Sequence, residues 1–339
     1  MGCGRIFPMA AHRSLPQGIT FRPYRGEADL PAMAVCANAS FAADGSEVVR
    51  TVADMARDYT TFTACKPLED VWLAEAGGEV AGYIRCWPWT QADGMRFYGQ
   101  LGFVAPQWRR QGVGTALLAW AEQRQRTLAA QHPEAPGHQH HVFVLQGEDA
   151  RAALLQKSGY RPVRHFFSMV RPSLEDIADF ALPPHLELRP VQPEQYRIIW
   201  ETHLKSFHTH WGYAPQTEQD YQAWLQGRNF QPHLWQVAWD RRTNEVAGQV
   251  RTFIDDSYNF TRTRLRGWTE FISVGERWRR QGVARALISH SLRAQKAAGM
   301  LESSLGVDAG NASGATRVYA DCGFIVEKRN TAYRKPVTL

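Results

Sequence analysis

An unusual phrase occurs twice in this 339-residue chain. It reads PQWRRQGVGTALL at residues 106–118 and ERWRRQGVARALI at residues 276–288. From Gly112 to Gly282 the copies are 282 − 112 = 170 residues apart, half of the chain and within the usual domain length of roughly 100–200 residues. A repeat of this period constrains the fold, because both halves must accommodate the same local structure.

The repeat extends beyond the phrase. Short apolar runs at 19–24 and 186–191 predict a first strand in each half, and a stretch with helical periodicity follows each one. The segments 70–87 and 233–253 each predict a pair of strands joined by a turn. The two halves therefore begin with the same order of elements.

The phrase lies between a predicted strand and a predicted amphipathic helix. The strands are expected at 100–104 and 270–274, and the helices at 115–131 and 285–299. Each half then closes with strand, helix and strand. Strands that pair first through a hairpin and later through helices predict an α/β fold with two tandem modules, each a mixed, mostly antiparallel sheet flanked by helices.

These patterns suggest four segments. Residues 1–17 form a leader that we expect to be disordered, and residues 18–172 form an N-terminal module. Residues 173–185, which include a pair of prolines, are expected to be a linker, and residues 186–339 form a C-terminal module.

Composition narrows the class of protein. With 44% hydrophobic and 21% charged residues the chain is typical of globular proteins, and no run approaches the ~18 apolar residues of a membrane span. The net charge of +6 is modest and forms no long basic run, which argues against nucleic acid as a partner. We expect a cytoplasmic monomer or homodimer without a membrane or nucleic-acid partner.

No metal site is predicted. The five cysteines are scattered without a close pair, which argues against zinc and against a disulfide framework. The run HQHH at 138–141 could suggest metal binding, but it has no evident partner ligands, so we interpret it as a solvated strand edge.

The repeated phrase has the chemistry of a phosphate-binding loop. Arg-x-x-Gly-x-Gly or Arg-x-x-Gly-x-Ala between a strand and a helix places free backbone N–H groups at a helix N-terminus. Glycine costs roughly 0.5–1 kcal/mol in a helix relative to alanine, so its presence suggests a close approach to the backbone. Two other phosphate motifs do not fit: no Gly-Lys-Ser/Thr follows, and Leu117 and Leu287 stand where a dinucleotide fold needs a small residue.

At these residues the chain resembles the GNAT acetyltransferase superfamily, whose signature is Gln/Arg-x-x-Gly-x-Gly/Ala after the fourth strand. The resemblance covers about residues 18–172 and 186–337 and is to tandem proteins of the mycothiol synthase type, in which the C-terminal half is active. It implies that the loop holds the pyrophosphate of acetyl-CoA and that the preceding strand pairs with the pantetheine arm.

Carried over residue by residue, the resemblance implies two sets of cofactor-binding residues. In the C-terminal half they are Phe271, Ile272, Ser273, Val274, Arg279, Arg280, Gln281, Gly282, Val283, Ala284 and Asn311. In the N-terminal half they are Leu101, Gly102, Phe103, Val104, Arg109, Arg110, Gln111, Gly112, Val113, Gly114 and Thr115.

The resemblance also implies catalytic residues in the C-terminal half. Glu270, at the expected start of the fourth strand, is placed to act as general base, because an ammonium group must lose a proton before it can attack a thioester. Tyr319, in the closing segment, is placed to donate a proton to the leaving thiolate. At the same positions the N-terminal half has Gln100 and Leu155, so we expect that half to be non-catalytic.

The acceptor is expected to enter opposite the cofactor. The candidate residues, which lie together in the segment 206–224, are His208, His210, Trp211 and Tyr213. The same residues are equally typical of a packed junction between a helix and a loop.

The sequence favours an acetyl-CoA-dependent N-acetyltransferase that acts on a small-molecule or peptide amine by direct attack. One alternative is a non-catalytic sensor or scaffold that binds acyl-CoA, and intact Glu270 and Tyr319 argue against it. Another is an aminoacyl transferase of tandem GNAT type, and the modest charge and the intact loops argue against that.

Overall fold

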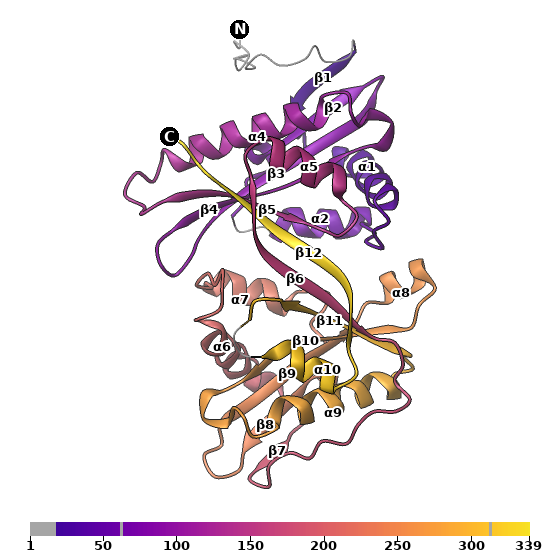
Figure 1. Cartoon of the computed structure of the whole chain (residues 1–339), viewed down its shortest axis with the longest axis vertical. Helices are drawn as coiled ribbons and strands as arrows, with labels where there is room; N and C mark the ends of the chain where they lie inside the picture. The colour runs from indigo at the N-terminus through magenta and orange to yellow at the C-terminus, as the bar shows by residue number, and fades with distance from the viewer. Residues whose placement is uncertain (1–17, 62–63, 312–313) are drawn as a thin grey trace.

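Two bodies of sheet and helix lie one above the other, joined by two long strands that run from one to the other (Figure 1). The structure is a computed structural model, and it describes residues 18–61, 64–311 and 314–339. The leader predicted at residues 1–17 lies outside the described residues.

Each module contributes six strands to the described structure. Those of the N-terminal module are β1 (Ile19–Pro23), β2 (Val71–Ala76), β3 (Glu79–Thr90), β4 (Arg96–Val104), β5 (His138–Val144) and β6 (Arg161–Arg171). Those of the C-terminal module are β7 (Leu186–Leu188), β8 (Gln236–Asp240), β9 (Val246–Ile254), β10 (Arg266–Val274), β11 (Glu302–Asp308) and β12 (Ile325–Pro336).

The helices also repeat between the modules. The N-terminal module has α1 (Leu30–Ala43), α2 (Val52–Thr61), α3 (Pro67–Asp70), α4 (Val113–Ala129) and α5 (Asp149–Lys157). The C-terminal module has α6 (Tyr196–Phe207), α7 (Glu218–Leu225), α8 (Asp256–Arg262), α9 (Val283–Ala297) and α10 (Ala315–Asp321).

The predicted fold class is confirmed, but the two expected sheets are one. The strand order is β1-β2-β3-β4-β5-β12-β6-β11-β10-β9-β8-β7, with only the β4–β5 and β10–β11 pairs parallel. Strand β12 pairs with β5 through residues 331–336 and with β6 through residues 325–334. Strand β6 in turn pairs with β11. The closing strand of each module therefore lies beside the other module (Figure 1).

This exchange corrects the interpretation of the HQHH run. Strand β5 is not an edge, because β12 covers its outer side. His140 is 1% exposed, and its Nδ1 is hydrogen-bonded to the Gln125 side chain. The His138 ring is hydrogen-bonded instead to Tyr98. Neighbouring histidines thus have separate partners, and no cluster of three potential metal ligands occurs among the residues that the structure describes.

Helices cover both faces of the sheet in each module. In the N-terminal module α1 and α2 pack on one face against Val71, Leu73 and Tyr83. Helix α4 packs on the opposite face against the small side chains of Ala74 and Ala81. In the C-terminal module α6 and α9 occupy the corresponding positions. The helices cover the faces of the sheet, so a ligand site is expected where the paired parallel strands, β4–β5 or β10–β11, separate from each other.

The segment 173–185 forms no helix or strand but is packed. Leu174 is 1% exposed and belongs to the core around α9, and Ile177, Phe180 and Leu182 pack against the same core. The segment therefore follows the surface of the C-terminal module.

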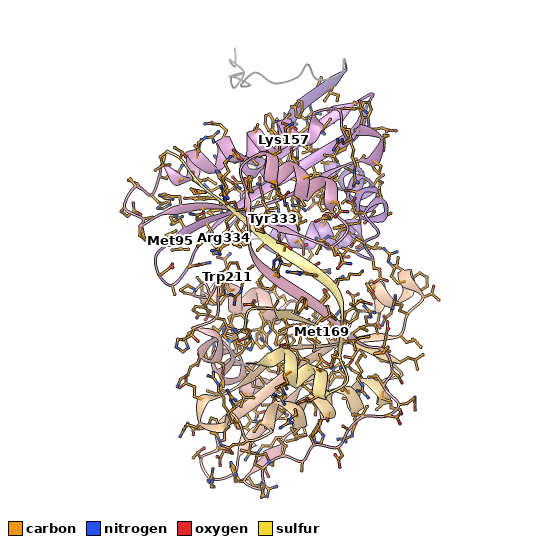
Figure 2. All side chains as sticks on the ribbon, viewed as in Figure 1. Met95, Lys157, Met169, Trp211, Tyr333 and Arg334 are labelled. Atoms are coloured by element: carbon orange, nitrogen blue, oxygen red, sulfur yellow. The ribbon has the colours of Figure 1, made fainter. Side chains whose placement is uncertain are left out.

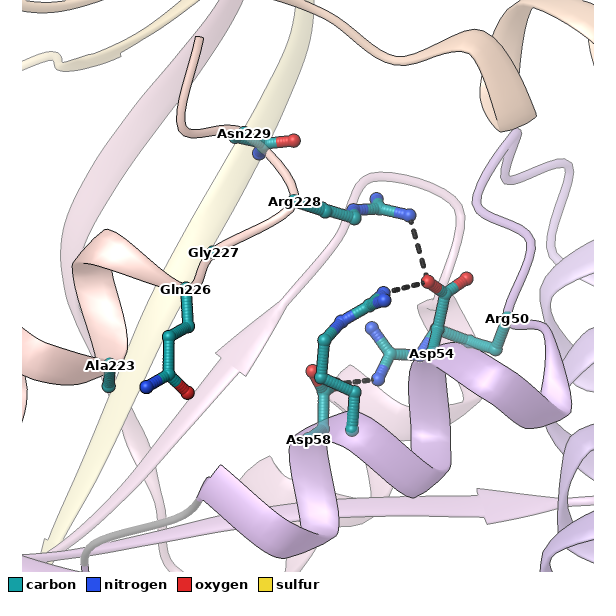
Figure 3. A pocket seen from close by; sticks show the side chains of 9 residues that line it. Arg50, Asp54, Asp58, Ala223, Gln226, Gly227, Arg228 and Asn229 are labelled. Carbon is teal, nitrogen blue, oxygen red and sulfur yellow. Dashed lines mark hydrogen bonds and ion pairs between the residues drawn. The ribbon is translucent and has the colours of Figure 1, made fainter. Parts of the chain in front are cut away.

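Polar contacts also join the modules. Arg228, which follows α7, pairs with Asp54 of α2 at 3.2 Å and with Asp255 at 2.6 Å. Arg228 and Asp54 border a hollow of about 250 Å³ between the modules (Figure 3). Glu47, from the loop before α2, pairs with Arg264 at 2.8 Å.

Four cysteines lie in the described residues, and all four are buried and unpaired. None of the described helices has the length and apolar character that crossing a membrane requires.

Candidate active site

The loop before α9 leaves backbone N–H groups free at a helix N-terminus. Gly282 adopts the left-handed conformation with φ 83°, and α9 begins at the next residue. The N–H of Ala286 is the first to bond back, to the carbonyl of Gly282, so the N–H groups just before it have no helical partner. A Cβ at Gly282 would meet no atom within 4 Å. The backbone at this point is therefore open to a ligand, as a pyrophosphate needs.

The equivalent loop of the N-terminal module has the same backbone but a different environment for its first arginine. Gly112 has φ 88°. Arg109, however, is held by Asp44 at 2.6 Å and by the Ser40 hydroxyl at 2.8 Å. Arg279, its counterpart, is half exposed, and its Nε donates to the carbonyl of residue 274 in its own loop. At this position the C-terminal loop therefore presents the less tightly held arginine.

Strands β10 and β11 separate at the centre of the C-terminal module. Their pairing covers only Arg266–Trp268 with Glu302–Ser304. Beyond it, β10 also carries a bulge against β9, since the register shifts between Glu270 and Ser273. Phe271 within the bulge has φ 53°, a strained value for an aromatic residue. The unpaired edge of β10 can accept an extended ligand, which fits the predicted place of the pantetheine arm.

Glu270 lies at the start of this separation. Its Oε1 accepts a hydrogen bond of 2.8 Å from the N–H of Gly306 on β11, so the side chain bridges the gap between the strands. Burial raises the pKa of Glu270 to about 7, and hydrogen bonds from the N–H groups of Gly306 and Phe271 oppose the rise. A carboxyl group with this pKa can accept and release a proton near neutral pH.

Tyr319 lies on α10 close to the same carboxylate. It is 8% exposed and packs in the core of the C-terminal module. Burial, and to a smaller extent the nearby charge of Glu270, raises the pKa of the Tyr319 phenol. The phenol therefore stays protonated at neutral pH, as a proton donor must.

The N-terminal module lacks this arrangement. Its β3–β4 pairing runs without a register shift from Gly82 and Val104 to Thr90 and Arg96. Gln100 is buried, and its Nε2 donates to the hydroxyl of Tyr160 at 2.9 Å.

A hollow of about 240 Å³ lies beside Gln100, and its lining is largely aromatic. The lining residues are Trp87, Trp89, Gln100, Leu101, His141 and Phe143.

At the position of Tyr319 the N-terminal module has the buried Leu155. Gln100 and Leu155 therefore cannot take up a proton from an amine or give one to a thiolate, as Glu270 and Tyr319 could.

The four predicted acceptor residues are divided between two places. Trp211 packs against His141 and Phe166 of the N-terminal module, with the Arg334 guanidinium 4.2 Å from its ring (Figure 2). The carbonyl of Tyr213 accepts a hydrogen bond from the N–H of Ala92 in the β3–β4 hairpin. For these two residues the contacts support an inter-module junction.

The two histidines differ as well. The exposed His208 is hydrogen-bonded through Nδ1 to the Lys205 carbonyl. The His210 ring lies against that of Phe207 with their centroids 4.1 Å apart, and Phe207 lies in turn against His203, whose ring is 5.7 Å from that of Phe271. Of the four candidates, only His210 has contacts that lead towards the bulge of β10.

Sequence reasoning missed Arg251, which lies on β9 directly opposite Glu270 in the strand register. A signal was available: the segment EVAG-x-Ile/Val-Arg occurs at 79–85 and again at 245–251. The local pattern of this segment is that of an ordinary hairpin strand, and it does not indicate that the arginine is buried.

Both modules of the chain match models of a known protein family. Residues 67–162 match the family model described as an acetyltransferase (GNAT) domain, and residues 193–324 match the acetyltransferase (GNAT) family. The mycothiol acetyltransferase of Thermobifida fusca is 29% identical over 246 residues, 68% of this chain and 72% of that protein.

Solved structures agree on the fold. A GCN5-related N-acetyltransferase from Sphaerobacter thermophilus matches with a TM-score of 0.73 and 24% identity over 96% of this chain and 98% of its own. A tandem GNAT protein from the clavulanic acid biosynthesis pathway matches with a TM-score of 0.63 and 17% identity over 95% of this chain and 99% of its own. The chain therefore belongs to the GNAT superfamily of acetyltransferases and carries two of its domains in tandem.

Proposed function

We propose that this protein is an acetyl-CoA-dependent N-acetyltransferase whose C-terminal module transfers the acetyl group to a small-molecule amine by direct attack. The observation that carries the proposal is the position of Glu270: a carboxyl group with a pKa of about 7, at the bulge where β10 and β11 separate. The open loop at Gly282 and the unpaired edge of β10 fit the cofactor.

The cofactor supplies an activated acetyl thioester, and the residues of the chain handle the protons. Glu270 accepts the proton of the ammonium group, which gives the amine a free lone pair. Tyr319 would donate its phenolic proton as the thiolate leaves, and the second proton that the nitrogen loses as the amide forms would restore the phenol. The N–H groups at the start of α9, together with Arg279, bind the pyrophosphate and fix the thioester beside Glu270.

We assign the N-terminal module a structural role. Gln100 and Leu155 cannot transfer protons, and Asp44 places a carboxylate on the arginine of the loop, where it would repel a phosphate. We therefore do not assign acetyl-CoA binding to the predicted residues 101–104 and 109–115 of this module. We expect one acetyl-CoA per chain, and a cytoplasmic monomer or homodimer.

Thiol release from acetyl-CoA in the presence of an amine panel tests the proposed function. An acetyltransferase releases CoA only when a suitable amine is present, whereas a sensor or scaffold binds acetyl-CoA without amine-dependent release. Absence of acetyl-CoA binding in calorimetry would contradict both and would favour a charged tRNA as donor.

Replacing Gly282 with asparagine should weaken acetyl-CoA binding by about tenfold or more, since each factor of ten is only about 1.4 kcal/mol. Asparagine tolerates the left-handed backbone, so its side chain enters the open approach without a large loss of stability. The matched control is Gly112→Asn, which has the same backbone in the other module. Calorimetry should find its acetyl-CoA affinity unchanged. A stronger effect at Gly112 than at Gly282 would reverse the roles of the modules.

Replacing Tyr319 with phenylalanine should lower kcat by about 10- to 100-fold, at or below the usual worth of a positioned acid, because a thiolate leaves readily even without a proton. The acetyl-CoA dissociation constant should stay the same. Tyr160→Phe is the control, since it removes a buried hydroxyl that is bonded to Gln100. Steady-state kinetics that show equal kcat values for Tyr319→Phe and the wild type would leave Tyr319 as a packing residue.

A further inference from the structure

Arg251 is a buried cation without a counterion among the described residues. It is 3% exposed, and its Nε and Nη1 atoms have no hydrogen-bond partner in that part of the chain. Burial alone lowers its pKa to about 9, so the guanidinium keeps its charge at neutral pH. An unpaired buried charge is costly, and a chain retains one where a ligand completes it.

The surroundings of Arg251 lead to the reacting centre. Arg251 and Glu270 are register partners on β9 and β10, so their side chains leave the sheet on the same face. The guanidinium lies 4.2 Å from the ring of Phe271, the strained bulge residue, and 5.2 Å from that of Trp224. The Glu270 carboxylate turns away to the N–H of Gly306 and leaves the positive charge unbalanced.

The neighbouring His203 does not add a second positive charge. Burial, together with the charge of Arg251, lowers the pKa of His203 to about 2, so the imidazole is neutral. Its Nδ1 lies 3.4 Å from the Ser273 hydroxyl. The face of the sheet beside Glu270 is therefore aromatic and singly positive, which suits an anionic group attached to an organic body.

We propose that the amine acceptor carries a carboxylate group, and that Arg251 binds this carboxylate while Glu270 takes the proton from the amine. This inference rests on the proposed function and adds the substrate class. A single guanidinium matches the single charge of a carboxylate. Phe271, which is 45% exposed and lies over the guanidinium, must shift aside for the carboxylate to reach it.

The test compares matched amines with acetyl-CoA and the whole chain. The first set is phenylalanine, phenylalaninamide and phenethylamine, and the second is 4-aminobutyrate, 4-aminobutanamide and butylamine. The carboxylate member should have a kcat/KM about 10- to 1,000-fold higher than its neutral partners, through a lower KM. Equal values across a set would overturn the inference and leave the acetyltransferase proposal intact. A preference for 2-aminoethyl phosphate over 4-aminobutyrate would overturn the choice of carboxylate.

Variants identify the residue responsible. Arg251→Met should reduce the preference for carboxylates to within about threefold, and Arg251→Lys should keep part of it, because lysine retains the charge but not the planar donors. Arg85→Met makes the same change at the repeated position of the N-terminal module and should retain the full preference. Persistence of the preference in Arg251→Met would overturn the assignment.

A binding measurement needs no turnover. Benzoate should raise the Tm of the wild type and of Arg85→Met more than benzamide does, and it should lose this effect in Arg251→Met. An equal benzoate shift in Arg251→Met would overturn the inference. Arg251→Met should itself melt no lower than the wild type, since it removes an unpaired buried charge. A large drop in its Tm would instead assign Arg251 to stability.

Discussion

Replacing Glu270 with glutamine is expected to lower turnover by about 10²- to 10⁴-fold at neutral pH, the usual worth of a positioned base. Glutamine keeps the size of the side chain and can still accept the hydrogen bond from Gly306, but it cannot take up a proton. Acetyl-CoA affinity should be almost unchanged, because the residue lies away from the loop to which we assign the pyrophosphate. Steady-state turnover and calorimetry measure the two effects.

The pH profile gives the sharper comparison. Because the pKa of Glu270 is raised to about 7, the wild-type rate should rise with pH through about 7 as the carboxylate ionises. The variant should lack this limb and keep any limb at higher pH that comes from the acceptor amine. If the limb near pH 7 survives in Glu270→Gln, the carboxylate is structural and another group is the base.

Two controls accompany this variant. Burial disfavours the ionised form of Glu270, so the protonated carboxyl group stabilises the folded state. This contribution to the free energy of unfolding is lost as pH rises through the folded pKa. The variant with a neutral glutamine should therefore melt no lower than the wild type at pH 8. The reciprocal Gln100→Glu variant places a carboxylate at the same position of the other module. It should add no activity, because β4 has no bulge and Leu155 stands where the phenol is needed.

Separation of the two modules is expected to abolish cooperative folding of each. A chain of residues 18–172 would leave β5 without β12 and β6 without both of its neighbours. It would also lose Tyr333, which is 6% exposed in the N-terminal core among Leu118, Val142 and Tyr160. Replacing a buried aromatic residue by alanine alone typically costs about 3–5 kcal/mol, a large part of the stability of a domain.

Thermal melting followed by circular dichroism, together with dye binding to exposed apolar surface, measures this loss. The control is a full-length chain cleaved at an inserted protease site between Ile177 and Phe180. Its two fragments should remain associated and should melt as one unit, since the exchanged strands still pair. A cooperatively melting, monomeric fragment 18–172 would contradict the exchange of closing strands.

The local structure could be predicted well from the repeated phrase. The helices begin at Val113 and Val283, directly after the glycines and two residues before the predicted starts, and β10 ends at the predicted Val274. These features depend on residues that are close in sequence, such as a glycine that permits a left-handed backbone and an apolar face with helical period. The phrase alone was therefore enough to locate both loops.

Features that depend on distant partners were not predictable. The same phrase gives an arginine bound to Asp44 in one module and a half-exposed arginine in the other, because only one module places an aspartate there. The bulge at Phe271 arises from the pairing of β10 with β9, and a strand pattern does not specify its register with a partner. The sequence predicts an acceptor site around Trp211 because aromatic residues gather there. It does not show that the partners of Trp211, such as Phe166, lie in the other module.

The exchange of closing strands also affects how the protein is made. The second neighbour of β5 is β12, which is the last strand of the C-terminal module. During synthesis, one edge of the N-terminal sheet is therefore expected to stay unpaired until β12 has been translated. An open edge of this kind invites pairing with other nascent chains, and a molecular chaperone that holds it would prevent such pairing. The two modules are therefore expected to complete their folding together, once β12 has been made, rather than one after the other.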